Sequence, residues 1–201
     1  MGGYFYDYPE ILFMAGALWL VTSGSFWPLV PLTALATVNK EAFLFFVPAL
    51  YPFIRVRASR IEAITQVGIL LLTAGATYLV IRNAYLANPG WAAQNHSPEA
   101  LAYYLNPMNL LRRETTYGLR VFQAYSFVTL GLVGLVAFRG WRGQSAAVRD
   151  HIRLAAAINV PLFLLLCFPG EVRNLSLLYM GFLFLLCENF AILDRDRTGQ
   201  R

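Results

Sequence analysis

Long apolar runs make up most of this chain of 201 residues, and its ionisable residues stand in short groups between them. Only 13% of the residues are charged, compared with about 25% in an average soluble domain. A soluble globule of this size has more surface than so few charged side chains can cover. The sequence therefore predicts an integral membrane protein.

The basic excess fits the same interpretation. A net charge of +5 is expected to reflect topology and contact with lipid headgroups, and no interleaved basic and aromatic pattern suggests a nucleic-acid partner. Cys167 and Cys187 lie inside apolar runs, which argues against a disulfide framework. The first residues lack a basic segment before an apolar run, so no cleavable signal is expected.

Six apolar stretches are candidates for membrane spans, because a spanning helix needs about 20 mostly apolar residues. We expect an all-α, polytopic transmembrane helical bundle of about six spans over residues 1–193, with an outer loop over residues 86–120. Residues 194–201 are expected to form a charged cytoplasmic tail. The six stretches cover residues 8–22, 26–54, 61–85, 121–138, 154–168 and 175–193.

The stretch over residues 26–54 decides the topology, because Asn39-Lys40-Glu41 interrupts it. As one helix it places Lys40 and Glu41 near the middle of the bilayer, at roughly 2.5–3.5 kcal/mol each. Two short helices joined at this tripeptide let both charges reach headgroups or a wet cleft. We favour this broken form, which gives seven crossings with the amino terminus outside. The alternative is one unbroken helix, with six crossings and the amino terminus inside.

The distribution of basic residues fits both forms. In the broken form ten arginines lie on the inner side and six basic residues on the outer side, as the positive-inside rule requires. We expect a bacterial inner membrane with the carboxy terminus in the cytoplasm. The inner residues are Arg55, Arg57, Arg60, Arg139, Arg142, Arg149, Arg153, Arg195, Arg197 and Arg201, and the outer ones are Lys40, Arg82, Arg112, Arg113, Arg120 and Arg173.

The outer loop contains a helix start at Ser97-Pro98-Glu99, with a hydroxyl cap, a proline and an acid in the first turn. The residues that follow are amphipathic, and Asn106-Pro107 is expected to kink or restart the helix. We expect a pair of short helices in the membrane interface. The alternative is a partly ordered loop packed on its own protein.

Several ionisable groups collect on the outer face in the favoured topology. Asp7 and Glu10 are three residues apart and share a helix face. Carboxylates beside basic side chains can hold a phosphate and activate a hydroxyl, as transfer from a lipid phosphate requires. If the protein is an enzyme, the catalytic candidates are Asp7, Glu10 and Glu41. The candidates for binding lipid or phosphate are Lys40, Arg82, Arg112, Arg113 and Arg173.

Each of these groups also has a structural interpretation. Asp7 and Glu10 can offset a helix dipole, and ion pairs among Lys40, Glu41, Glu171 and Arg173 can hold helices together. His96 lacks further ligands at a suitable spacing, so no metal site is expected. No phosphate loop or hydrolase motif is present in the sequence, and no cofactor is expected beyond bound lipids.

Three segments carry a resemblance to a known family: YFYDYPEILFMAGALWL, ALATVNKEAFLFFVPAL and PGEVRNLSLLYMGFLFLL. They resemble segments of the GT-C polyprenyl-phosphate-sugar glycosyltransferases and their uncharacterised bacterial relatives. The resemblance implies a fold of many membrane helices whose outer face binds a lipid-linked sugar. By position, Asp7 matches the family's second outer acid, and Lys40-Glu41 matches its lysine segment.

The resembled enzymes carry their principal catalytic acid in an outer loop upstream of the helix that Asp7 opens, and the present sequence begins at that helix. We therefore expect a non-catalytic accessory subunit of a larger membrane complex, with a respiratory or photosynthetic assembly among the possible partners. The alternative is a glycosyltransferase, or part of one, that uses a polyprenyl-phosphate-linked sugar donor.

Overall fold

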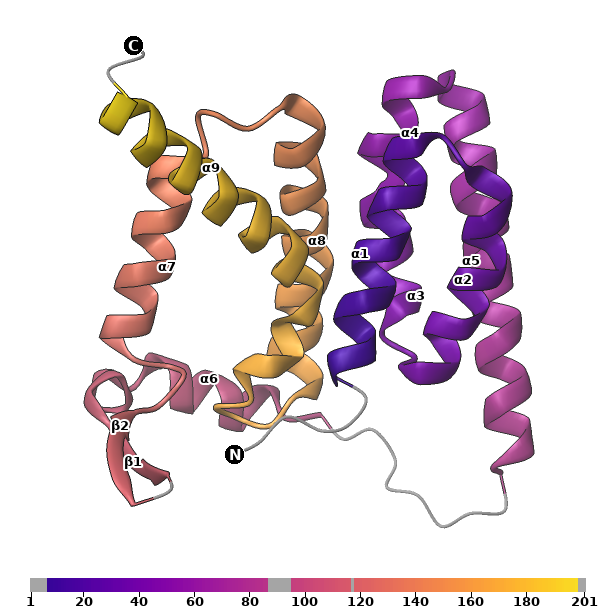
Figure 1. Cartoon of the computed structure of the whole chain (residues 1–201). Coiled ribbons are helices and arrows are strands. Elements are labelled where there is room, and N and C mark those ends of the chain that lie inside the picture. The colour runs from indigo at the N-terminus through magenta and orange to yellow at the C-terminus, as the bar shows by residue number, and fades with distance from the viewer. Residues whose placement is uncertain (1–6, 87–94, 117, 199–201) are drawn as a thin grey trace.

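A computed structural model describes residues 7–86, 95–116 and 118–198. Within these ranges the regular secondary structure is helical except for one small hairpin (Figure 1). The α-helices are α1 (Asp7–Ser23), α2 (Phe26–Asn39), α3 (Phe43–Phe46), α4 (Tyr51–Arg57), α5 (Arg60–Ala84), α6 (Ser97–Leu105), α7 (Phe127–Gly140), α8 (Ala146–Leu166) and α9 (Tyr179–Thr198). The 3₁₀ helices are η1 (Val47–Leu50), η2 (Pro107–Leu111) and η3 (Val172–Leu178), and the strands are β1 (Arg113–Thr116) and β2 (Leu119–Phe122).

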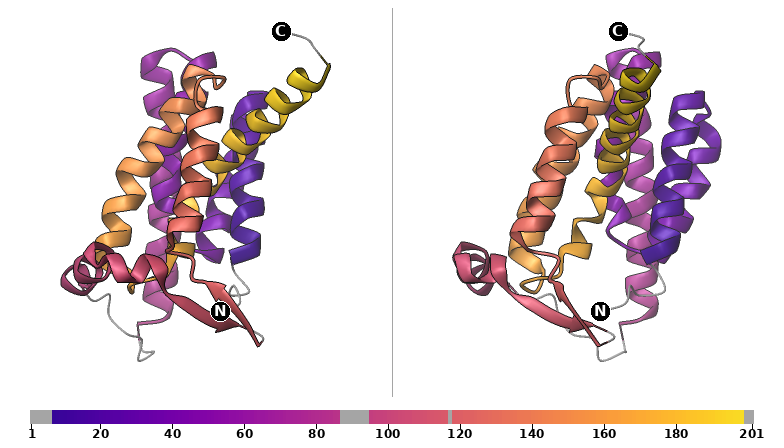
Figure 2. Two further views of the ribbon diagram at one scale, coloured as in Figure 1. Left: turned by 90° about the vertical axis from the view of Figure 1, so that its left-hand side faces the viewer. Right: turned by 60° about the vertical axis from the view of Figure 1, so that its left-hand side comes forward.

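The long helices run between two ends of the molecule (Figures 1 and 2). We call one the basic end, where α4, α7 and α9 finish and α5 and α8 begin. We call the other the hairpin end, where α1 begins and where α6 and the antiparallel β1–β2 hairpin lie. The basic end carries nine arginines on the ends of these helices and the turns between them: Arg55, Arg57, Arg60, Arg139, Arg142, Arg149, Arg153, Arg195 and Arg197.

The apolar stretch over residues 26–54 is broken where its charges predicted. Helix α2 ends at Asn39, Lys40 adopts an extended conformation with φ −154°, and α3 begins at Phe43. The chain reverses at this break, so that α3, η1 and α4 return toward the basic end (Figure 1). The break exists because it keeps Lys40 and Glu41 out of a continuous apolar helix. The predicted break at Asn39-Lys40-Glu41 is present, and the second part of the stretch consists of α3, η1 and α4.

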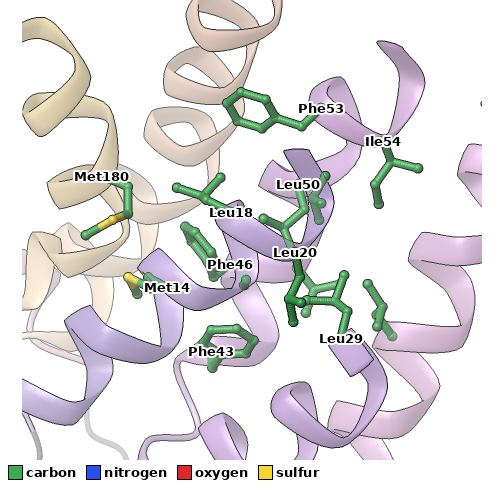
Figure 3. Close-up of a cluster of buried hydrophobic side chains, with 14 of the residues drawn as sticks. Met14, Leu18, Leu20, Leu29, Phe43, Phe46, Leu50, Phe53, Ile54 and Met180 are labelled. Atoms are coloured by element: carbon green, nitrogen blue, oxygen red, sulfur yellow. The ribbon is translucent and has the colours of Figure 1, made fainter. Parts of the chain in front are cut away.

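The core lies where the two halves of the helical bundle meet α1. Met14 of α1, Leu29 of α2, Phe43 and Phe46 of α3 and Met180 of α9 form one buried cluster (Figure 3). Each of these side chains is at most 4% exposed. Since α3 and η1 fill the centre of this cluster, the break in the 26–54 stretch also supplies core side chains.

Three serines determine where helices begin. Ser59, Ser126 and Ser145 each accept a hydrogen bond from a backbone N–H of the first turn, which starts α5, α7 and α8. The first turn of α6 differs, since the N-cap is His96 and Asn95 Oδ1 accepts from Ser97 N. The serine predicted as a cap is therefore the first helical residue.

Some boundaries predicted from hydropathy are wrong. The span predicted over residues 121–138 begins at Phe127, because residues 119–122 form strand β2. The span predicted over residues 154–168 begins at Ala146, since Ser145 caps two polar turns that hydropathy leaves out. The last helix continues to Thr198, with Arg195 Nη2 2.9 Å from Glu188 Oε1.

Within the described residues, two helices are long and apolar enough to cross a membrane by length and composition, Arg60–Ala84 and Val172–Thr198. Phe26–Asn39 and Phe127–Gly140 are shorter apolar helices. Helix length alone thus does not establish six spans. Two of these apolar helices leave most of their side chains outside the protein interior, because α5 buries only Ala63, Leu70 and Ala74, and α7 buries only Gly140.

Candidate functional site at the hairpin end

A buried carboxylate lies at the centre of the hairpin end. Lys40 Nζ donates to Glu10 Oε2 across 2.6 Å and to Asp7 Oδ1 across 3.3 Å. Ser176 Oγ donates to the other oxygen of Glu10, Oε1, across 2.7 Å. Because the Glu10 side chain is only 2% exposed, a lysine and a serine hold both its oxygens inside the protein. We call Asp7, Glu10, Lys40 and Ser176 the carboxylate cluster.

Local structure explains why these residues meet. Asp7 and Glu10 lie in the first turn of α1, on one face and at the positive end of the helix dipole. Lys40 is the C-cap of α2, and its backbone is extended instead of helical, so its side chain does not continue the pattern of the α2 surface. Ser176 belongs to η3, which precedes α9 and is buried at this point. The cluster therefore joins three segments that lie far apart in the sequence.

A second polar group lies along η3. Arg173 Nη2 donates to Glu171 Oε1 across 3.0 Å, and Asn174 Nδ2 donates to Glu171 Oε2 across 3.1 Å. Asn159 Nδ2 of α8 donates to the Asn174 carbonyl across 3.0 Å, and Tyr179 Oη donates to the Arg173 carbonyl across 3.0 Å. These bonds fix the irregular segment between α8 and α9.

Aromatic residues attach α6 to the bundle. Gly170 has φ +88°, which favours glycine, and its N–H donates to Tyr104 Oη across 3.0 Å. Tyr103 Oη donates to Gln123 Oε1 across 3.0 Å, and Tyr125 Oη donates to the Tyr104 carbonyl across 2.8 Å. Burial raises the pKa of both Tyr103 and Tyr104 above the ordinary tyrosine value. This segment is packed on its own protein through hydrogen bonds and ring contacts.

The structure brings together only part of the predicted site. Asp7, Glu10 and Lys40 meet, and Glu171 pairs with Arg173. Glu41 is exposed, and the ion pairs of Lys40 run to α1 instead of to Glu41 or Glu171. The reason is that the N-terminal turn of α1 packs beside the end of α2.

The predicted phosphate-binding arginines are spread over the hairpin end. Arg82 Nη1, at the end of α5, donates to Tyr78 Oη across 2.8 Å. Arg113, in β1, lies over the Phe122 ring at 4.8 Å from its centroid, and Arg112 is exposed beside it. The end of α5 and the hairpin lie on opposite sides of the bundle (Figure 1). The described residues therefore do not assemble one phosphate site from Arg82, Arg112 and Arg113.

Three buried polar residues were not predicted from the sequence: Ser176, Asn159 and His151. His151 Nδ1 donates to the Ala49 carbonyl across 2.6 Å, between the rings of Phe46 and Phe53, and so ties α8 to η1. For Ser176 and Asn159 the sequence contains a signal, because each is a polar residue within an apolar run. His151 lies between Asp150 and Arg153 in the polar first turns of α8 and has no such signal. A single polar residue inside an apolar run must find a partner when the helix is buried.

Within the described ranges, no group of three or more His, Cys, Asp or Glu side chains is placed to hold a metal ion. Cys167 is half-buried and Cys187 is exposed, both as free thiols. Comparisons with protein-family models, characterised proteins and solved structures find no significant match to this chain.

Proposed function

We propose that this chain is a multi-pass integral protein of a bacterial inner membrane and serves as a non-catalytic accessory subunit of a larger membrane complex. The observation that carries the proposal is the surface of α7. Gly140 is its one buried residue, and Phe127, Leu132 and Phe138 are each more than half exposed. An apolar helix so little covered by its own chain requires lipid or another protein around it.

The small residues of α7 favour a protein partner on part of this surface. A Cβ added at Gly131 or Gly134 meets no atom within 4 Å. These glycines are three apart and lie on one helix face, where the lack of side chains allows a neighbouring backbone to approach closely. Membrane helices pack through such small residues, since lipid and leucine are equally apolar.

The carboxylate cluster supports a structural role over a catalytic one. A general base must reach the proton that it removes. Glu10 is almost fully buried, and both its oxygens accept hydrogen bonds from Lys40 and Ser176. Lys40 is in turn committed to two carboxylates, which leaves it poorly suited to bind a lipid phosphate.

Purification from native membranes tests the proposal. The protein should resist extraction with alkaline carbonate and should leave the membrane in mild detergent as part of a complex of fixed stoichiometry. Gly134→Leu should release it from that complex without changing the helical content measured by circular dichroism. Carbonate extraction of the wild-type protein, or a monomer as the only species in mild detergent, would contradict the proposal.

A transferase that uses a polyprenyl-phosphate-linked sugar is the second candidate. It is favoured by the clustering of Asp7, Glu10 and Lys40 at one end of the bundle, with 19% of the Asp7 side chain and 16% of the Lys40 side chain exposed. Purified protein in nanodiscs is given such a donor with candidate acceptors, and no polyprenyl phosphate should be released above a protein-free control. Release that disappears in Asp7→Asn and persists in Glu41→Gln would favour the transferase.

A further inference from the structure

A groove opens at the basic end, opposite the carboxylate cluster. It lies between α4 and the first turns of α8 and has a volume of about 510 Å³. This volume is within the range of about 300–1,000 Å³ that is usual for small-molecule sites. The residues that give the groove its chemistry are Arg55 and Val56 from α4 and Ala147, Asp150, Arg153 and Leu154 from α8.

The groove combines positive charge with apolar walls. Arg55 and Arg153 line it together with one acid, Asp150. Val56 is 70% exposed, and it contributes an apolar wall together with Leu154. The groove can therefore bind a charged lipid headgroup and an apolar acyl chain beside each other.

Both arginines keep donors for a ligand. Among the described residues, Arg55 makes one hydrogen bond, from Nη1 to the Ala58 carbonyl at 2.8 Å. Arg153 makes one hydrogen bond, from Nη1 to Asp150 Oδ1 at 2.8 Å, and its guanidinium lies over the Trp141 ring. A guanidinium has five N–H donors in a planar fork that matches the oxygens of a phosphate.

We infer that this groove binds one anionic phospholipid, whose phosphate lies between Arg55 and Arg153 and whose acyl chains lie against Val56 and Leu154. The inference rests on the proposed membrane location, in which the arginine-rich basic end faces the inner leaflet. It differs from the outer phosphate candidates because it uses the opposite end of the bundle and other residues. Groups with a net positive charge select an anionic headgroup over a zwitterionic one.

Asp150 sets the strength of this site. Its carboxylate lies in the groove and pairs with Arg153, so it both holds that guanidinium and repels a phosphate. The pair is solvent-exposed, with side-chain exposures of 64% for Arg153 and 54% for Asp150, and exposed pairs contribute little to stability. Removal of the carboxylate should therefore strengthen lipid binding while leaving the fold intact.

Native mass spectrometry of the detergent-purified full chain tests the inference with phosphatidylglycerol and phosphatidylcholine of identical acyl chains. Phosphatidylglycerol should bind more tightly, and Arg55→Gln and Arg153→Gln should each weaken it about fivefold, as expected for about 1 kcal/mol per arginine near a membrane surface. Asp150→Asn should bind it more tightly than the wild type. Arg142→Gln is the matched control, because Arg142 is exposed at the same end but does not line the groove.

The outcomes separate this inference from the proposed function. Equal binding of the two lipids, or equal effects of Arg55→Gln and Arg142→Gln, would overturn the lipid site while the protein still resists carbonate extraction. Displacement of phosphatidylglycerol by millimolar inorganic phosphate would also overturn it, since the acyl chains would then add nothing. Carbonate extraction of the wild type would instead overturn the membrane location itself.

Discussion

Ser176 donates a hydrogen bond to Glu10 across 2.7 Å, although the two residues are 166 positions apart in the sequence. Lys40 holds the other oxygen of the same carboxylate. One buried side chain thus connects α1, the end of α2 and η3, and through them the first and last thirds of the chain. Removing one partner of such a buried ion pair is costly, because the other charge is then left uncompensated inside the protein.

The first prediction concerns Lys40. Lys40→Met should lower the free energy of unfolding by about 3–5 kcal/mol, because it leaves Glu10 charged and unpaired inside the protein. The double variant Glu10→Gln/Lys40→Met should lose less than the two single variants together, because the buried charge is removed with its partner. Thermal unfolding in detergent, followed by circular dichroism, measures both.

Glu41→Gln is the control for this experiment. Glu41 adjoins Lys40 in sequence but is exposed, so its substitution should change the unfolding free energy by less than about 0.5 kcal/mol. Strict additivity of Glu10→Gln and Lys40→Met would show that the pair does not act as one unit. Strong coupling of Lys40 to Glu41 would assign the lysine a different partner.

The second prediction concerns the contact between α7 and α9. A Cβ at Gly140 would lie 2.6 Å from the Leu185 carbonyl oxygen, a backbone atom that cannot move independently. Gly140→Ala should therefore destabilise the protein by about 1–3 kcal/mol, the usual cost of overpacking. Gly134→Ala, where a Cβ meets nothing within 4 Å, should be neutral or slightly stabilising in the isolated chain. Equal melting temperatures for the two variants would contradict the contact.

Much of the fold was predictable because hydropathy and charge act locally. Apolar runs predicted the positions of α1, α2 and α5 to within one or two residues, and the charges of Asn39-Lys40-Glu41 predicted the break. The starts of α7 and α8 were mispredicted, although Ser126 and Ser145 were visible as caps in the sequence. These serines are local signals as well, but the boundaries were predicted from hydropathy instead of from the caps.

The rest depended on packing between distant segments. The shared face of Asp7 and Glu10 follows from their spacing, but the choice of Lys40 as their partner requires α1 to pack beside the end of α2. Ser176 lies within an apolar run, and nothing in the sequence around it indicates a contact with Glu10, 166 positions away. The β1–β2 hairpin was also missed, because Arg-Glu-Thr-Thr has little of the apolar alternation that predicts a strand.

The third prediction concerns pH and the attachment of α6. The pKa of Tyr103 and of Tyr104 is raised in the folded state by burial, whereas an unfolded tyrosine has a pKa of about 10. Their contribution to stability is therefore complete below about pH 10 and is lost as the pH rises through their raised folded pKa. The melting temperature of the wild type should fall more between about pH 9 and about pH 11 than that of Tyr103→Phe/Tyr104→Phe.

Tyr85→Phe provides the control for the alkaline experiment. Tyr85 is 63% exposed, at the end of α5. Its substitution should leave the fall in melting temperature as large as in the wild type. If the double variant at Tyr103 and Tyr104 shows the same fall as Tyr85→Phe, ionisation of the α6 tyrosines does not drive the loss of stability.

The last prediction concerns topology. The basic end carries nine described arginines, whereas the hairpin end carries Lys40 and five arginines, so the positive-inside rule predicts that the basic end faces the cytoplasm. Single cysteines at the exposed positions Glu41, Glu99 and Arg142 report this directly, in a chain where Cys167 and Cys187 are replaced. Residues 1–6 and 87–94, which include Gly3 and Ala93 as further labelling positions, lie outside the described residues.

An impermeant thiol reagent applied to the outer face should label Glu41→Cys and Glu99→Cys and should reach Arg142→Cys only after the membrane is opened. Labelling of Glu41→Cys and Glu99→Cys from different sides would mean that the broken stretch does not return across the bilayer. Labelling of Arg142→Cys from outside would reverse the orientation and would move the inferred lipid site to the outer leaflet.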